Sequence, residues 1–156
     1  MSAPLLQNFV ARPPSEVEWE DLLVRLEITP RALRLAVEDV GDSPQLRALL
    51  SVAAAREHGW GERLEDMREG RSFNENAGFG PAPEDGTGAA EWVAVFTRQR
   101  ERTFARVQRR GLEVWDWRSG PQPGNEPGTA YQLLQVMAHT DGELLAAIRA
   151  LGKGNR

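Results

Sequence analysis

The segment of residues 129–151, TAYQLLQVMAHTDGELLAAIRAL, decides the predicted fold of this 156-residue chain. Thr129 and Gln132 have the spacing of a capping box at a helix start, and Gly152 is a typical helix stop signal. Between these signals, apolar residues recur at helical spacing. The segment is therefore predicted to form one long amphipathic helix.

One face of this predicted helix combines apolar and polar side chains. At about 100° per residue, that face contains Leu133, Met137, Thr140, Asp141, Leu144, Ile148 and Leu151. His139 points away from it. Thr140 and Asp141 are therefore predicted to face the protein interior, where a polar group needs a partner.

Three other segments have helical periodicity, which predicts an all-α chain. They cover residues 15–40, 43–69 and 87–110. Thr29-Pro30 has the pattern of a helix start, because proline is favoured at the first helical position, and it predicts a break in the first segment. Four helices joined by loops most economically form an up-down-up-down four-helix bundle.

The chain length fits one domain with a core of its own. Residues 1–14 are expected to form an N-terminal arm that ends at two prolines. Residues 15–151 are expected to form the helical bundle, and residues 152–156 a C-terminal tail.

Glycine and aromatic residues mark two places where segments are expected to pack closely. Gly59 and Gly61 flank Trp60, so that either the helix bends there or a neighbouring element approaches it closely. Phe73 and Phe79 are expected to hold the following glycine- and proline-rich loop onto the bundle.

Composition restricts the classes of function. The net charge is −4 and there is no cysteine, which argues against a general nucleic-acid or anionic-membrane binder and excludes thiolate chemistry. No apolar run reaches the ~18 residues of a membrane span, and the N-terminus lacks a basic leader, so a cytoplasmic protein is predicted. Six arginines spread around their helix and are expected to form a solvated face: Arg98, Arg100, Arg102, Arg106, Arg109 and Arg110.

The two histidines suggest one hypothesis for a metal site. His139 and Glu143 are four residues apart, and with His58 they would form a displaced three-ligand site. All three side chains lie away from the apolar faces of their helices, which favours exposed histidines without a metal. No metal or other cofactor is therefore expected.

Charged residues on apolar faces suggest a second hypothesis. Arg100 falls on the inner face of its predicted helix, and Arg56 lies towards the inner face of another. An Arg100–Asp141 ion pair, joined by Arg56 and lining a polar pocket with Thr140, would satisfy these buried charges. Alternatively, these residues lie at the ends of the bundle and extend their charged groups into water.

Two segments resemble a known family. Residues 29–67, TPRALRLAVEDVGDSPQLRALLSVAAAREHGWGERLEDM, resemble the first half of a DinB/YfiT-like domain, and residues 132–151 resemble its last helix. The resemblance extends loosely over residues 15–151. It implies an up-down-up-down four-helix bundle, often dimeric, in which many members bind a divalent metal such as nickel or zinc through three histidines. Some relatives are thiol-dependent transferases or isomerases.

The metal motif of that family does not match this sequence. Aligning LLAAI on the family's H-L-A-Q-I ending places the histidine pair at Thr140 and Leu144. The third histidine falls at Val52, or at Ala53 if the register shifts by one. None of these side chains can replace an imidazole ligand. Asp141 is retained at a position where relatives often carry aspartate.

Two functional hypotheses follow from the resemblance and the residues together. The first is a DinB-like bundle without its metal centre, acting as a non-catalytic, stress-associated binding or interaction protein. It would form a homodimer and bind an unknown small molecule. The second is a metal- or thiol-dependent transferase or hydrolase, acting at the displaced histidine site or at the Arg100–Asp141 pocket. Neither hypothesis includes nucleic acid or a membrane as a partner.

Overall fold

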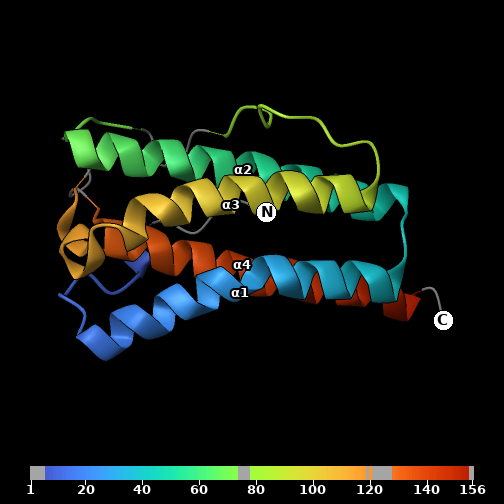
Figure 1. Ribbon diagram of the computed structural model, residues 1–156, viewed down its shortest axis with the longest axis horizontal. Helices are drawn as coiled ribbons and strands as arrows, with labels where there is room; N and C mark the ends of the chain where they lie inside the picture. The colour runs from blue at the N-terminus through green and yellow to red at the C-terminus, as the bar shows by residue number, and fades with distance from the viewer. Residues whose placement is uncertain (1–5, 74–77, 119, 121–127, 155–156) are drawn as a thin grey trace.

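A computed structural model describes residues 6–73, 78–118, 120 and 128–154 of the chain. The described residues form four long helices, which confirms the predicted all-α bundle: α1 Glu16–Val40, α2 Pro44–Glu69, α3 Ala89–Gln108 and α4 Ala130–Gly154. Two short 3₁₀ helices, η1 Leu6–Asn8 and η2 Gly111–Asp116, precede α1 and follow α3. In Figure 1 the four long helices lie side by side along the length of the molecule.

The order of helix directions differs from the prediction. Figure 1 shows α2 and α3 running in the same direction, with α1 and α4 running together in the opposite one. Contacts agree, because Asp42 before α2 accepts from the amide of Ala89 at the start of α3, and Gly61 accepts from Arg106 further along both helices. The predicted up-down-up-down order is therefore wrong. Residues 78–88 return along the bundle, so the long α2–α3 loop is a crossover.

Helix α1 is continuous through Pro30, so the predicted break near Thr29-Pro30 is also wrong. Proline has no amide proton, and the carbonyl of Leu26, four residues earlier, loses its helical donor. That carbonyl accepts instead from Arg100 Nη1 at 2.8 Å. Figure 1 shows α1 changing direction near its middle, as expected for an interior proline.

Side-chain or glycine caps are present at ends of α1, α2 and α4, and the α4 cap is the predicted one. Ser15 and Glu18 form a reciprocal capping box, Ser43 caps α2, and Gly70 ends α2 in the left-handed conformation with φ of 69°. Thr129 and Gln132 form the capping box of α4, with bonds of 3.2 Å and 2.9 Å.

The predicted stop at Gly152 is wrong, because α4 continues to Gly154. A Cβ atom at Gly152 would lie 3.1 Å from Val40 Cγ2, so this glycine allows α1 and α4 to approach closely at their ends. The first part of the predicted C-terminal tail is therefore helical.

Close packing, rather than a helix bend, explains the glycines beside Trp60. A Cβ at Gly59 would lie 2.0 Å from the ring of Phe79, and one at Gly61 would lie 3.0 Å from Thr103 Oγ1. The Trp60 and Phe79 rings meet edge to face, with centroids 6.1 Å apart. The loop is thus held onto α2 as predicted.

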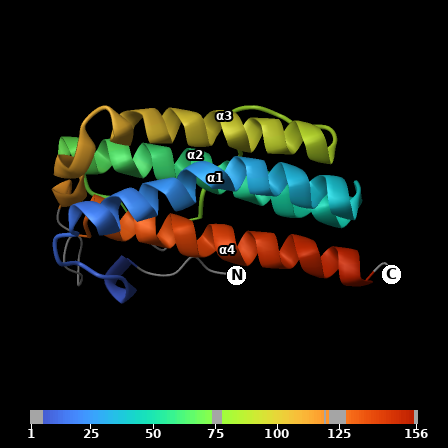
Figure 2. The ribbon, with the colours of Figure 1, turned by 60° about the horizontal axis from the view of Figure 1, so that its bottom comes forward.

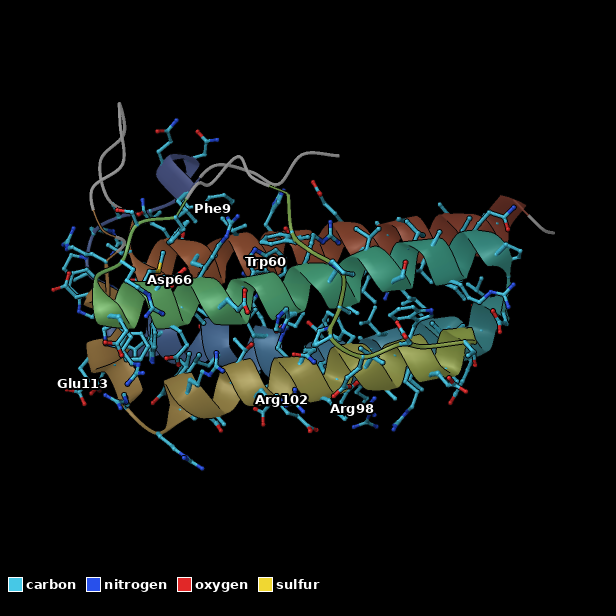
Figure 3. The ribbon with its side chains drawn as sticks, turned by 90° about the horizontal axis from the view of Figure 1, so that it is seen from above. Phe9, Trp60, Asp66, Arg98, Arg102 and Glu113 are labelled. Carbon is cyan, nitrogen blue, oxygen red and sulfur yellow. The ribbon has the colours of Figure 1, made fainter. Side chains whose placement is uncertain are left out.

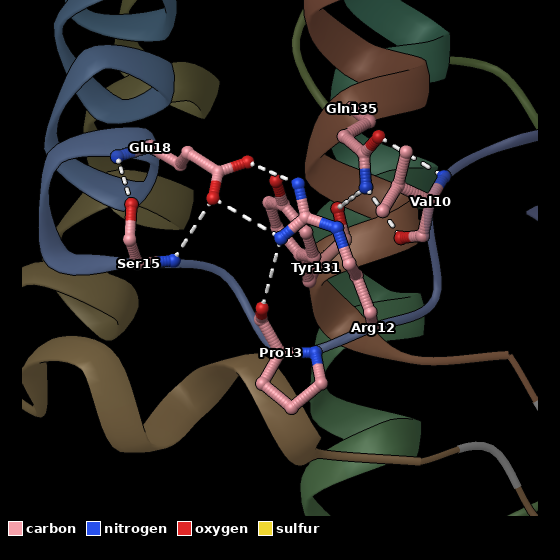
Figure 4. A network of polar contacts seen from close by, with 7 residues as sticks. All are labelled: Val10, Arg12, Pro13, Ser15, Glu18, Tyr131 and Gln135. Atoms are coloured by element: carbon pink, nitrogen blue, oxygen red, sulfur yellow. Dashed lines mark hydrogen bonds and ion pairs between the residues drawn. The ribbon is translucent and has the colours of Figure 1, made fainter.

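The N-terminal segment lies against α4. Gln135 pairs with both backbone groups of Val10, and Gln132 Nε2 donates to the carbonyl of Phe9. Arg12 forms two hydrogen bonds with Glu18, of 2.9 Å and 3.1 Å, at the start of α1 (Figure 4). Figure 2 shows η1 beside the first half of α4. The described part of the predicted arm is therefore packed onto the bundle.

The apolar core consists of two clusters, one towards each end of the bundle. One cluster contains Leu22, Leu64 and Met137, and the other contains Leu33, Leu50 and Ile148. Between them along every helix lies a buried polar residue: Thr29, Glu57, Arg100 and Asp141. A polar layer therefore crosses the middle of the core.

Candidate functional site

Arg100 is the centre of the polar layer and is 2% exposed. Its Nε and Nη2 donate to the two oxygens of Glu57 at 2.7 Å and 2.9 Å. Its Nη1 and Nη2 donate to the two oxygens of Asp141, both at 2.8 Å. With the bond from Nη1 to Leu26, all five guanidinium protons have acceptors.

Thr29 completes the coordination of Asp141. Its hydroxyl lies 2.7 Å from Asp141 Oδ2 and 3.1 Å from the carbonyl of Arg25, and its single proton goes preferentially to the charged carboxylate. The layer therefore joins one residue or more from each of the four helices. A buried ion pair of this kind fixes the relative positions of the elements that carry it.

The electrostatics of this layer follow from its burial. Burial alone would lower the pKa of Arg100, but the two adjoining carboxylates outweigh that effect and raise it. The two carboxylates therefore stabilise the charged form of Arg100. Its guanidinium also lies 4.9 Å from the ring centroid of Phe96.

The predicted Arg100–Asp141 pair is thus formed, whereas the predicted participation of Arg56 is not. Glu57 takes that place. The sequence carried a signal for Glu57, because Ala53, Glu57 and Trp60 repeat at the spacing of one helical face. The alternative in which these charges reach water at the bundle ends is wrong for Arg100 and Asp141, which are 2% and 6% exposed.

Arg56 lies instead in a pocket between α2 and α4. The pocket has a volume of about 310 Å³. It is lined by Gln45, Ala48, Leu49, Val52, Arg56, Thr140, Glu143, Leu144 and Ala147. The pocket therefore brings together Arg56 and Thr140 with Val52 and Leu144, while Arg100 and Asp141 do not line it.

Two polar atoms on the lining residues of this pocket lack a hydrogen-bond partner within the described part of the chain. They are Arg56 Nε and Thr140 Oγ1, and both are buried. The Arg56 guanidinium carbon lies 6.0 Å from the ring centroid of Trp60. Burial lowers the pKa of Arg56, while Asp141, Glu143 and Glu57 oppose that shift.

A larger groove of about 710 Å³ lies between α1 and α3, with Val37 and Val93 in its walls. Within the described residues, none of the buried unpaired polar atoms belongs to its lining residues. The groove between α1 and α3 is therefore mainly an apolar surface, and the α2/α4 pocket is the better candidate for specific recognition.

The structure separates the histidines of the displaced metal site. His139 Nε2 lies 3.0 Å from Glu143 Oε1, whereas His58 Nε2 lies 3.2 Å from Glu62 Oε1 on its own helix. Among the residues that the structure describes, no three His, Cys, Asp or Glu side chains are grouped as metal ligands. His58, His139 and Glu143 therefore do not form the three-ligand site considered from the sequence.

The arginine-rich helix α3 has a solvated outer side. Figure 3 shows Arg98 and Arg102 projecting from α3 away from the other helices. Both pair with Glu84 of the crossover, at 2.8 Å and 3.3 Å. The prediction of a solvated face holds for these two arginines but not for Arg100.

Comparisons of the chain with models of known protein families, with curated proteins and with solved structures give no match. None of the described helices is long and apolar enough to cross a membrane. The fold and the pocket define a four-helix bundle with a central ionic layer and a small, partly polar pocket beside it.

Proposed function

We propose that this chain is a DinB-like bundle whose α2–α3 crossover replaces the up-down-up-down order implied by the resemblance. It lacks a three-histidine metal centre and binds a small molecule in the pocket between α2 and α4. One observation carries the proposal. Val52, Thr140 and Leu144, the positions that align with the histidines of the family, all line this one pocket. Valine and leucine supply no donor atom for a metal, and a threonine hydroxyl is a poor substitute for imidazole.

The lining of the pocket supports binding rather than covalent chemistry. Most of its walls are aliphatic, and its polar lining residues are Gln45, Arg56, Thr140 and Glu143. A small pocket with apolar walls and a few directed polar groups is typical of a ligand site. Arg56 and Thr140 have no adjacent general base in hydrogen-bonding distance among the described residues.

The alternative function is a metal- or thiol-dependent transferase or hydrolase. The contact between His139 and Glu143 favours it, because Glu143 also lines the pocket. Two ligands would leave most of a zinc or nickel coordination shell to water or substrate. Elemental analysis of protein purified without an affinity metal separates the two functions. Stoichiometric zinc or nickel in the wild type that is absent from His139→Ala would support the metal-dependent enzyme function.

A thermal-shift screen of small metabolites tests the proposed binding function. Ala147 lines the pocket and is partly exposed, so Ala147→Phe fills the pocket without enlarging the core. Compounds that bind in the pocket are expected to raise the melting temperature of the wild type and not that of the variant. A screen in which no compound distinguishes the two proteins would contradict the proposal.

Self-association is proposed for the outer face of α1. Four exposed apolar side chains lie there within about 20° of one direction around the helix: Val17, Val24, Ile28 and Leu35. Their spacing is symmetric about residue 26, so in an antiparallel pair of copies Val17 faces Leu35 and Val24 faces Ile28. In that register Glu20 lies opposite Arg31 of the other copy, and within the described chain neither forms an ion pair.

Sedimentation equilibrium tests this second copy as the partner. One helix from each copy gives a small interface, so a dissociation constant of roughly micromolar order is expected. Glu20→Lys is expected to weaken the dimer, and adding Arg31→Glu is expected to restore it. A monomer at all concentrations, or a failure of the second substitution to restore association, would contradict the proposed surface.

A further inference from the structure

The hydroxyl of Thr140 lacks the bond to a helical carbonyl that the hydroxyl of Thr97 makes. Thr97 is also inside a helix, and its hydroxyl donates to the carbonyl of Val93 at 2.7 Å. Thr140 is 4% exposed, yet its Oγ1 makes no bond to the carbonyl four residues earlier or to any other described group. Its proton is therefore available to a group inside the α2/α4 pocket.

Arg56 offers a second available donor at the same pocket. Its Nε is buried and has no acceptor among the residues described by the structure. The guanidinium carbon lies 6.0 Å from the ring centroid of Trp60, within reach of a cation–π contact. Leaving a buried donor unpaired is unfavourable, so an acceptor that enters the pocket gains from both groups at once.

The lining residues of the pocket include one cation, Arg56, and one carboxylate, Glu143. Glu57 and Asp141 are both engaged with Arg100, and Glu143 is exposed and bonded to His139. The carboxylates near Arg56 therefore stabilise its charge from a distance without taking its Nε proton. A ligand oxygen is the partner that this geometry still lacks.

We propose that the pocket between α2 and α4 binds a small monocarboxylate, whose oxygens accept from Arg56 Nε and Thr140 Oγ1. This inference rests on the proposed function, because it names the ligand class of the same pocket. An arginine–carboxylate contact is strengthened by its charges and by its planar geometry. The tail of the ligand packs on Leu49, Val52 and Leu144. The volume of about 310 Å³ is large enough to hold an acid of benzoate or hexanoate size.

Calorimetric titration with hexanoate and with benzoate tests the ligand class. Hexanol and hexylamine carry the same tail with a neutral or a cationic head. Hexanoate is expected to bind the wild type at least tenfold more tightly than either of them. Equal binding of hexanol would overturn the carboxylate assignment and leave the binding function of the pocket intact.

Variants test the two donors. Arg56→Met is expected to weaken hexanoate binding at least tenfold, and Thr140→Val several-fold, because each keeps the approximate shape and removes one donor. Arg149→Met is the matched control, since Arg149 is exposed on α4 and does not line the pocket. A similar loss of affinity in Arg149→Met would indicate attraction by net charge and would overturn the site.

The screen and the titrations together distinguish a wrong ligand class from a pocket that binds no small molecule. If another compound from the screen binds the wild type but not Ala147→Phe, while hexanoate and benzoate bind neither, the carboxylate inference is wrong and the binding function stands. If no compound distinguishes wild type from Ala147→Phe, both are wrong. Circular dichroism of Thr140→Val and Arg56→Met verifies that each variant is folded before its titration is interpreted.

Discussion

Arg100 and Arg56 lie on neighbouring helices of one bundle, and both come close to Glu57 and Asp141, yet their guanidinium groups have opposite surroundings. Every N–H of Arg100 has an acceptor, and the side chain is closed off from solvent. Arg56 lines a pocket and leaves its buried Nε unpaired. The same residue type thus serves the architecture in one place and remains available for a ligand in the other.

This difference gives a rule for finding the site in a protein with few chemical motifs. A buried charge whose hydrogen bonds are all made inside the chain has no capacity left for a partner. A buried polar group without a partner beside a cavity has that capacity. The comparison therefore favours a role in stability for the ionic layer and supports the proposed binding role of the α2/α4 pocket.

The largest expected effect is on the ionic layer. Arg100→Met leaves Glu57 and Asp141 buried without their cation, so the free energy of unfolding is expected to fall by about 3–5 kcal/mol. Chemical denaturation of the wild type and the variant measures this loss of stability. Asp141→Asn is expected to cost less in the Arg100→Met background than in the wild type. Additive losses in this double-mutant cycle would contradict the coupling.

Thr29→Val is expected to have an intermediate effect. It removes the hydroxyl that donates to Asp141 Oδ2 at 2.7 Å and keeps the shape of the side chain. A hydrogen bond to a charged group contributes about 1.5–3 kcal/mol, and denaturation of the variant should show a loss in that range. Thr97→Val, on a partly exposed hydroxyl, is the matched control and should lose less.

Arg56→Met sharpens the comparison because its expected effect on stability is small. The substitution removes an unpaired buried donor and keeps the aliphatic stem, so the free energy of unfolding is expected to change by less than about 1 kcal/mol. A loss as large as that of Arg100→Met would mean that Arg56 belongs to the ionic layer.

The smallest effect is expected at the exposed pair in Figure 4. The hydrogen bonds from Arg12 lower the pKa of Glu18 to about 2 from an ordinary value of 4.5. The contribution of ionised Glu18 to the stability of the folded state is therefore complete above pH 4.5, and it is lost as the pH falls towards 2. Glu18→Gln should make the melting temperature slightly less sensitive to acid between these values. An unchanged dependence of the melting temperature on pH would contradict a contribution of Glu18 to acid stability.

The sequence predicts the elements of this fold better than their arrangement. Periodicity and caps locate the helices within a few residues, and the inward position of Arg100 and Asp141 predicts their pairing. Periodicity contains no information on helix direction, so the parallel α2 and α3 could not be read from it. The length of the α2–α3 loop was the available signal, since a crossover must span the bundle.

Two other differences come from tertiary contacts that override local rules. Pro30 has the pattern of a helix start, but the carbonyl that it frees is used by Arg100, so α1 continues. Gly152 has the pattern of a helix stop, but it lies against Val40, and α4 extends past it. The pocket residues Arg56 and Thr140 were identifiable by their position on the helices. Their unpaired atoms became evident only in three dimensions.

The most direct test of the central claim is urea unfolding of wild type and Arg56→Met, each with and without a saturating concentration of hexanoate. A ligand that binds only the folded state raises the free energy of unfolding by RT ln(1 + L/Kd), where L is the free ligand concentration. The account predicts that hexanoate stabilises the wild type and leaves Arg56→Met unchanged. Equal stabilisation of both proteins, or of neither, would contradict it.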